Sequence, residues 1–343
     1  MKVIVIGAGV AGLATARGLL RAGHDVEVYE ESPEPRTDGG SVTLWPGSTA
    51  ILEELKADWT GVGRRLETLE SWAADGRRLL TLDLTVPERR FGHPVVHVAR
   101  GELVELLSDG VPVTYGARAE HVVPERAEVR LSDGRTVRGD VLVGADGRRS
   151  VVRAALWGAD RATLSPWVTW QGFTTAPTPL TESRRAVMIA GRNGLCGLIP
   201  AGRGRLLWWF DVRSAPGRPF WADDPDVVGR LRERFGGWAE PVPAVLATIE
   251  DAGFFPHYRQ PIPSVWGRGR PRWPATRPTP CRPPWRRGPI RRSRTPGCSP
   301  GRSGTCGRTS GPGRRWCAGP PGWPPPRPPT CSGRSPDCCP TGS

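Results

Sequence analysis

The sequence contains little lysine, almost no cysteine before its C-terminal end and no long apolar run. Lysine occurs only at Lys2 and Lys56 among the 343 residues. No stretch reaches the ~20 apolar residues that a membrane-spanning helix needs, and the N-terminus lacks the charged, apolar and cleavable regions of a secretory leader. We therefore expect a cytoplasmic protein, with no membrane partner, that is long enough to hold two domains.

Cysteine is confined almost entirely to the C-terminal end. Cys196 is the only cysteine before position 281. The spacings of the other seven match no zinc site, and two of them are adjacent, so we predict neither a metal site nor a disulfide framework. These seven are Cys281, Cys298, Cys306, Cys317, Cys331, Cys338 and Cys339.

The formal net charge of +14 is also a property of that end. Residues 271–343 hold 14 arginines and one acid, Asp337, a net charge of +13, which leaves +1 for the first 270 residues. The same segment has 19 of the 38 prolines. Such a composition cannot bury enough apolar surface to fold, so we predict a disordered tail over 271–343 and no nucleic-acid partner. A nucleic-acid-binding protein that uses this basic tail is the alternative from another class.

The N-terminus contains the pattern of a dinucleotide-binding fold. The apolar run 2–6 has the length of a strand, three glycines follow it at Gly7, Gly9 and Gly12, and apolar residues then recur at helical spacing up to Leu20. In this pattern the first glycine permits the tight turn, the second lets a pyrophosphate approach the backbone, and the third brings the helix against the strand. The helix dipole and its first amides then face the phosphates.

A second predicted strand, residues 26–29, ends at Glu30. This acid stands eighteen residues after Gly12. A carboxylate at that place can accept hydrogen bonds from the hydroxyls of an adenosine ribose, and it disfavours a phosphorylated ribose.

The remaining pattern predicts an α/β protein with two folded regions and a tail. Residues 51–69 have mainly helical spacing, and residues 141–143 read as a buried parallel strand. From about residue 163 the chain alternates as mostly antiparallel strands, followed by helices. We therefore predict domains at 1–162 and 163–270, with the tail from 271.

Three segments, taken together, resemble the class A flavoprotein monooxygenases, the aromatic hydroxylases built like p-hydroxybenzoate hydroxylase. The first is the glycine turn with its acid at Glu30, and the second is the arginine and helix start of residues 98–103, VARGEL. The third is the Asp-Gly segment of residues 143–153, VGADGRRSVVR. The resemblance covers roughly residues 1–270.

The resemblance implies a Rossmann-like FAD-binding domain with an inserted, mostly antiparallel β-sheet substrate domain. It also implies FAD as cofactor, NAD(P)H as co-substrate, and hydroxylation of a small aromatic or polyketide-like molecule with O₂. The protein's part in that reaction is to position the reactants and exclude water, so we nominate no catalytic side chain. The substrate would lie near Trp170, Met188 and Trp208, although the same three residues fit a plain sheet core.

The resemblance also assigns contacts with the cofactor. Glu30 would hold the ribose of FAD and Arg100 its diphosphate, while Arg36 matches an arginine implicated in NAD(P)H binding. Solvated surface charge is the alternative for Arg36 and for Arg148. The complete predicted set is Gly7, Gly9, Val10, Ala11, Gly12, Glu30, Glu31, Arg36, Thr43 on the flavin side, Arg100, Ala119 at the adenine, and Asp146 with Gly147 at the diphosphate.

One family motif is absent. A Gly-Asp pair on a strand, followed by Ala-Ala-His and a glycine-rich helix start, should follow Arg270 at once. When the possible codons from Pro274 onward are regrouped by one base, they permit this motif and its helix. We therefore hypothesise a frameshift near residues 268–273, which leaves this chain impaired. A genuine basic tail is the alternative.

Two other activities occur on the same fold, those of a flavin halogenase and a reductase. A halogenase needs a catalytic lysine and a Trp-x-Trp-x-Ile-Pro segment. The chain offers only its two lysines, and residues 167–170, WVTW, have the wrong spacing. Monooxygenase is therefore the favoured activity.

Overall fold

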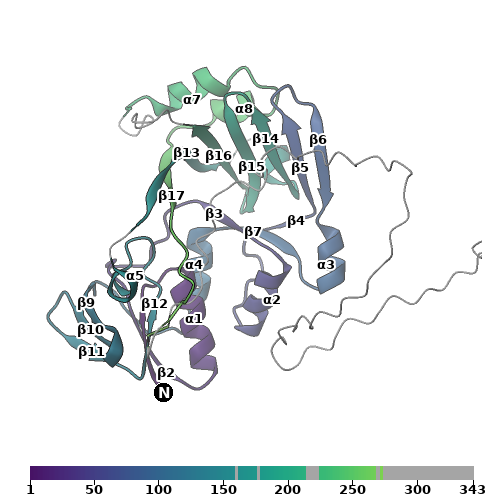
Figure 1. The fold of residues 1–343 in the computed structure, drawn as a ribbon. Coiled ribbons are helices and arrows are strands. Elements are labelled where there is room, and N and C mark those ends of the chain that lie inside the picture. Colours follow the sequence, from purple (N-terminus) through teal and green to yellow (C-terminus); the bar gives the residue numbers. More distant parts are fainter. Residues whose placement is uncertain (159–160, 176–177, 214–223, 268–270, 273–343) are drawn as a thin grey trace, which may run out of the picture. The chain divides into compact units, whose positions relative to one another are not determined.

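The structure is a computed structural model that describes residues 1–158, 161–175, 178–213, 224–267 and 271–272. The chain divides into two compact units, residues 1–287 and 288–343. The second unit lies outside the described residues, and so does the predicted disorder beyond Arg272. Within the described part the fold is α/β, as predicted (Figure 1).

A five-stranded parallel sheet contains the N-terminal strand at its centre. Its order is β18-β12-β1-β2-β8. The next strand in the sequence, β2, pairs with one side of β1, and the later strand β12 pairs with the other side. Ligands of open α/β sheets bind at such a switch point, beyond the carboxyl ends of the strands. The strands are β1 (Lys2–Ile6), β2 (Asp25–Tyr29), β8 (Val113–Thr114), β12 (Val141–Gly144) and β18 (Pro271–Arg272).

Helices cover both faces of this sheet. On one face α1 (Val10–Arg21) and α4 (Arg100–Ser108) bury Leu13 and Leu107 against Val5. On the other face α5 (Val151–Trp157) packs against a three-stranded sheet. That sheet consists of β9 (Ala119–Val123), β10 (Glu128–Leu131) and β11 (Thr136–Arg138), with the short 3-10 helix η1 (Pro124–Arg126) between the first two.

The mainly helical prediction for residues 51–69 was wrong. The helix α2 (Pro46–Glu54) ends early, and residues 64–66 form β4 beside β7 (Val95–Ala99). Gly63 explains the break because it has a φ of +73° and lies so close to the backbone that a Cβ would stand 2.5 Å from the oxygen of His97. The sheet β3-β7-β4 is completed by β3 (Ser41–Leu44).

A seven-stranded sheet of order β17-β13-β16-β15-β14-β5-β6 forms the second region. It is antiparallel except where β14 pairs with β5. Two of its strands come from residues 68–83, inside the stretch assigned to the first domain, while the division at 162 and 270 stays a prediction. The strands are β5 (Thr68–Ala73), β6 (Arg78–Asp83), β13 (Thr163–Thr174), β14 (Arg185–Gly191), β15 (Gly194–Gly202), β16 (Arg205–Arg213) and β17 (Gly253–Arg259).

One face of this sheet is covered by α7 (Val227–Phe235) and α8 (Val242–Ala247) (Figure 1). Trp170 and Trp208 lie in the core beneath them, with 3% and 1% of their surface exposed. Because side chains alternate along a strand, Thr169, Gln171 and Asp211 point to the opposite face. The short helix α6 (Thr178–Thr181) follows β13.

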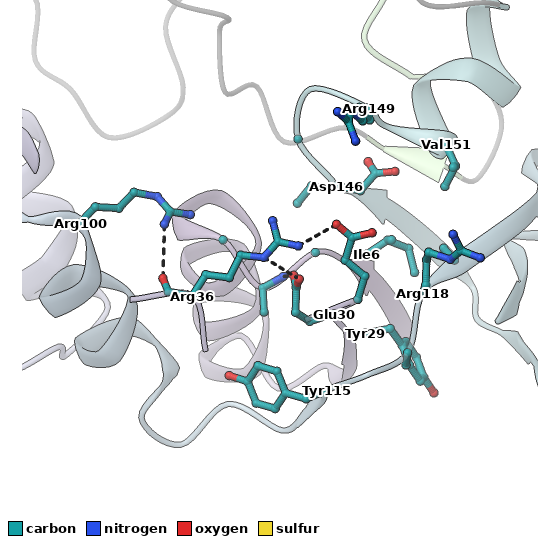
Figure 2. Close-up of a pocket in the computed structure, with 18 residues that line it drawn as sticks. Ile6, Tyr29, Glu30, Arg36, Arg100, Tyr115, Arg118, Asp146, Arg149 and Val151 are labelled. Atoms are coloured by element: carbon teal, nitrogen blue, oxygen red, sulfur yellow. Dashed lines mark hydrogen bonds and ion pairs between the residues drawn. The ribbon is translucent and has the colours of Figure 1, made fainter. Parts of the chain in front are cut away.

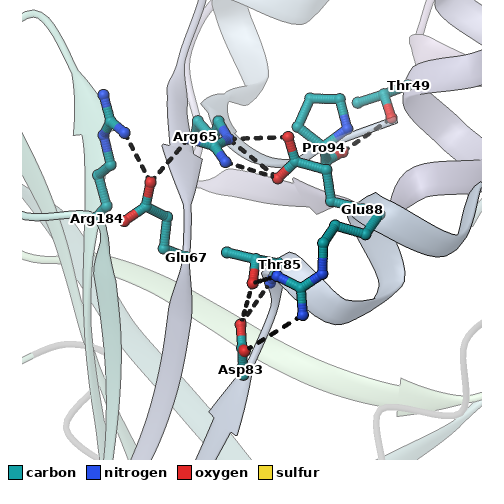
Figure 3. A network of polar contacts seen from close by, with 9 residues as sticks. Thr49, Arg65, Glu67, Asp83, Thr85, Glu88, Pro94 and Arg184 are labelled. Atoms are coloured by element: carbon teal, nitrogen blue, oxygen red, sulfur yellow. Dashed lines mark hydrogen bonds and ion pairs between the residues drawn. The ribbon is translucent and has the colours of Figure 1, made fainter. Parts of the chain in front are cut away.

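Ion pairs join the smaller elements to this sheet. Arg65 of β4 contacts Glu88 of α3 (Thr85–Phe91) at 2.9 Å and Glu67 at 2.8 Å, and Arg184 reaches the same Glu67 at 2.7 Å (Figure 3). These groups are partly exposed, so each pair contributes little by itself. Among the described residues, no helix has the length and apolarity needed to cross a membrane.

Candidate functional site

The turn between β1 and α1 is built by glycines with different roles. At Gly7 the φ is +100°, and a Cβ would lie 2.5 Å from the carbonyl oxygen of Ala145. A Cβ on Gly12 would lie 1.9 Å from the oxygen of Gly7, so this helix can begin so close to the strand only with glycine there. At Gly9 a Cβ would meet nothing within 4 Å. That open side is where a ligand can approach the backbone.

Glu30 fixes this turn from the end of β2. Its carboxylate accepts hydrogen bonds from the backbone N–H of Ala8 at 2.7 Å and of Ser32 at 3.0 Å. Arg36 lies beside it, with Nε 3.8 Å from a carboxylate oxygen of Glu30 and Nη2 2.8 Å from Glu31 (Figure 2). The predicted ribose-binding acid therefore also holds the glycine turn in place.

Arg100 begins α4 and reaches across the mouth of the same cavity. Its Nη1 donates to the carbonyl oxygen of Asp38 at 3.1 Å. The same Nη1 donates to the carbonyl oxygen of Arg36 at 3.3 Å (Figure 2). These bonds engage one nitrogen of the guanidinium. A guanidinium has five N–H groups in a planar fork, so the fork has donors left for an anion.

Asp146 follows β12 on the far side of the cavity. Its Oδ2 accepts from the backbone N–H of Val152 at 3.2 Å, whereas Oδ1 is buried and has no hydrogen-bond partner in the described part of the chain. Burial raises the pKa of this carboxyl, and hydrogen bonds from Ser150 and the backbone offset part of that rise. A buried acceptor without a partner is costly, so Oδ1 fits a ligand that donates a hydrogen bond.

Nine of the thirteen predicted residues line one cavity of about 240 Å³ at the carboxyl ends of the parallel strands. They are Gly7, Gly9, Glu30, Glu31, Arg36, Arg100, Ala119, Asp146 and Gly147. The sequence analysis missed Tyr115, Ala117, Arg118 and Arg149, which line it too. Tyr115 and Ala117 follow β8, so their position after a parallel strand was the available indication.

The other four predicted residues lie nearby. Val10 and Ala11 form the first turn of α1, and Gly12 packs against the turn. Thr43 stands on β3, where its hydroxyl is 2.8 Å from Nδ1 of His97. The roles of these four residues at the cofactor stay predictions.

His97 is a buried residue that the sequence analysis missed. Its Nε2 lies 2.7 Å from the hydroxyl of Ser41 and its Nδ1 lies 2.8 Å from that of Thr43, so β3 engages both ring nitrogens. Burial lowers the pKa of His97 from 6.5 to about 3, which keeps the imidazole neutral at physiological pH. A polar residue within the apolar run VVHVA was the only indication in the sequence.

These observations fit a dinucleotide with an adenosine end and a diphosphate. The cavity combines a backbone turn open at Gly9, a carboxylate at the ribose position and a guanidinium with remaining donors. Asp146 adds the unpartnered acceptor.

The family comparison agrees with this geometry. Residues 1–236 match the family described as "FAD binding domain". The chain is 28% identical over 281 residues to the aurachin C monooxygenase/isomerase of Stigmatella aurantiaca, covering 79% of this chain and 72% of that protein. It is 29% identical over 262 residues to the FAD-dependent urate hydroxylase of Klebsiella pneumoniae, covering 73% and 67%.

The solved structures include a close relative in fold. Klebsiella pneumoniae HpxO complexed with FAD and uric acid superimposes with a TM-score of 0.72 at 26% identity, covering 80% of this chain and 72% of that one. The chain belongs to the FAD-binding family of class A aromatic monooxygenases, and it is an FAD enzyme by that membership.

Proposed function

We propose that this protein uses FAD, NAD(P)H and O₂ to hydroxylate a small aromatic or polyketide-like molecule. One observation carries the proposal: nine predicted residues, six of them from three separate motifs, meet in a single cavity at the switch point of the parallel sheet. The relatives support the reaction class, because they include a urate hydroxylase and a 3-amino-4-hydroxybenzoate 2-monooxygenase.

Within this proposal each residue around the cavity has a binding task. Glu30 accepts from the adenosine ribose while it holds the amide of Ala8. Arg100 pairs with the diphosphate, and Asp146 accepts a hydrogen bond through Oδ1. FAD, when bound, supplies the redox chemistry of the reaction.

The sheet region would shield the reaction from water. The side chain of Gln171 on β13 lies against Gly40. A Cβ on Gly40 would stand 2.2 Å from the side-chain amide nitrogen of Gln171. The face of the sheet opposite α7 and α8 thereby borders the FAD-binding region directly. Exclusion of water is the protein's main contribution in such a reaction, because water consumes reactive intermediates.

The absent third motif bears on whether this chain can work. β18 ends at Arg272 and runs parallel to β12, so its carboxyl end points to the sheet edge that holds Asp146. The missing Gly-Asp segment belongs immediately after such a strand. We therefore propose that the frameshifted chain is impaired at the flavin side of the site.

The test is made on the frame-restored protein supplied with a panel of hydroxyaromatic compounds under ¹⁸O₂. We expect bound FAD, NAD(P)H oxidation stimulated by a subset of the compounds, and one ¹⁸O atom in the product. Oxidation of NAD(P)H without any oxygenated product would contradict the proposal and favour a reductase. Incorporation of chloride or bromide in place of oxygen would favour the halogenase alternative.

Two further predictions remain open. A cytoplasmic location rests on the sequence alone, and cell fractionation tests it. Nucleic-acid binding by the tail lies outside the described residues, and a gel shift that the tail produces without residues 1–270 would favour it.

A further inference from the structure

A second cavity, of about 520 Å³, borders the first at Gly147. It lies over the face of the seven-stranded sheet opposite α7 and α8, and its apolar wall includes Phe255, Tyr258 and Trp266. A cavity of about 150 Å³ is enough to hold benzene, so this one has room for a substituted ring. Its volume is within the usual range of small-molecule sites.

Three polar side chains form a hydrogen-bonded chain that ends in this cavity. The hydroxyl of Thr169 on β13 donates to Oδ1 of Asp211 on β16, and it lies 2.6 Å from Nε2 of His257 on β17. Thr169 and Asp211 are buried, with 8% and 6% of their surface exposed. His257 lines the cavity, and its Nδ1 is buried without a hydrogen-bond partner in the described residues.

The order of this chain fixes the proton on the histidine ring. An ionised carboxylate only accepts hydrogen bonds, so the single proton of the Thr169 hydroxyl points to Asp211. The hydroxyl oxygen must then accept from Nε2–H of His257. In the neutral ring Nδ1 is consequently a bare acceptor on a side chain that lines the cavity.

The charges around the cavity favour an anion. Arg148 and Arg153 line it, and no carboxylate does among the described lining residues. The guanidinium of Arg148 lies 4.3 Å from the ring centre of Tyr258, and Arg153 donates to the oxygen of Gly147 at 3.1 Å. Asp211 is the acid nearest to His257 along the hydrogen-bonded chain, and it lies behind Thr169.

We propose that this cavity binds the substrate as a hydroxyaromatic molecule and that His257 takes the proton of its hydroxyl. The inference rests on the proposed function and names the group that prepares the ring. The substrate O–H bond breaks, an Nδ1–H bond forms, and the electron pair stays on the oxygen as a phenolate, so no oxidant is needed. Asp211, through Thr169, stabilises the resulting imidazolium, and the two arginines stabilise the phenolate. A ring bearing O⁻ is richer in electrons and therefore more reactive toward an electrophilic oxygen.

The experiment uses the full 343-residue chain without FAD and 4-nitrophenol as the probe, because its anion is yellow and its neutral form is not. The ionised fraction of the bound probe is measured by absorbance across pH. We expect the wild-type protein to bind the probe as the anion at a pH about one unit below the value for the free probe, a tenfold shift. His257→Gln should abolish that shift, and Thr169→Val should reduce it while probe affinity changes less than about threefold.

His121→Gln is the matched control, because His121 is exposed on β9 and does not line the cavity. Circular dichroism verifies that each variant is folded, and a misfolded His257→Gln is replaced by His257→Asn. An unshifted probe in the wild type, or an equal shift in the wild type and the His257 variants, overturns the inference. Because FAD takes no part in this measurement, FAD binding and oxygen incorporation test the proposed function separately.

Discussion

The two cavities of this protein are built on different principles. The first lies at the ends of parallel strands around a backbone turn, and several of its residues are neighbours within short motifs such as residues 7–12. The second contains three hydrogen-bonded side chains, Thr169 on β13, Asp211 on β16 and His257 on β17. Asp211 is 42 residues and His257 88 residues from Thr169 in the sequence. A site built around a backbone turn can be recognised from residues that are neighbours in the sequence. A site built from side chains on an antiparallel sheet depends on how the strands are paired.

Restoring the reading frame near codon 270 tests whether the first cavity suffices for FAD. We expect the 343-residue chain to purify poorly and without yellow colour, and the restored chain to carry about one FAD per protein. The reason is that, by the family resemblance, the missing helix start would face the reactive ring, so we expect its loss to leave the flavin exposed to water. Flavin absorbance after gel filtration measures the difference. Stoichiometric FAD with tightly coupled hydroxylation in the chain as written would falsify the frameshift hypothesis.

Gly12→Ala compared with Gly9→Ala separates the packing and binding roles of the turn. A Cβ at position 12 would stand 1.9 Å from a backbone oxygen, so we expect a loss of about 3 kcal/mol or more in the free energy of unfolding. At position 9 a Cβ meets nothing within 4 Å, so unfolding should change by less than about 0.5 kcal/mol.

For FAD binding, the variant that folds normally should be the one that shows the defect. In the frame-restored protein, Gly9→Ala should weaken FAD binding although it folds normally, because its methyl group occupies the approach to the backbone. Urea unfolding and FAD titration measure both quantities. Equal stability of the two variants would mean that the turn tolerates a side chain at either glycine.

Arg100→Ala in the frame-restored protein tests the guanidinium assigned to the diphosphate. We expect FAD binding to weaken by about 1.5 to 3 kcal/mol, the range for hydrogen bonds to charged groups. The control is Arg126→Ala, an exposed arginine outside the cavity. Unchanged FAD affinity in Arg100→Ala would mean that Arg100 only donates a hydrogen bond to the carbonyl oxygen of Asp38 and does not bind the diphosphate.

His97 gives the smallest effect and concerns the strands beside the first cavity. Its folded pKa of about 3 lies below the ordinary 6.5, so the unfolded chain binds the extra proton first. Its contribution to stability is therefore complete above pH 6.5 and is lost as the pH falls toward 3. Between about pH 7 and pH 5 we expect a loss of about 2 kcal/mol that His97→Gln lacks. Parallel pH slopes for the two proteins, measured by urea unfolding, would contradict this.

Local sequence patterns were enough to predict the parallel sheet, the glycine turn and nine of the eighteen residues that line the first cavity. Strand, turn and helix are encoded by residues close together. Asp146 follows the parallel strand β12 and therefore lies at the same sheet edge as the turn. Arg100 follows β7 of the antiparallel sheet β3-β7-β4, and its side chain lines the same cavity. Sequence spacing failed at residues 51–69, since nothing local shows that Gly63 must pack against the backbone of His97.

The second cavity and the burial of the sheet tryptophans depend on contacts between strands and helices that are far apart in the sequence. The sequence alone allows Trp170 and Trp208 to face either side of the sheet. In the structure both tryptophans lie on the face that α7 and α8 cover, so they are part of the core. Thr169, Asp211 and His257 meet only because β13 pairs with both β16 and β17 in a particular register. A shift of one residue in either pairing would turn the facing side chains to the other side, so their meeting is a property of the assembled sheet.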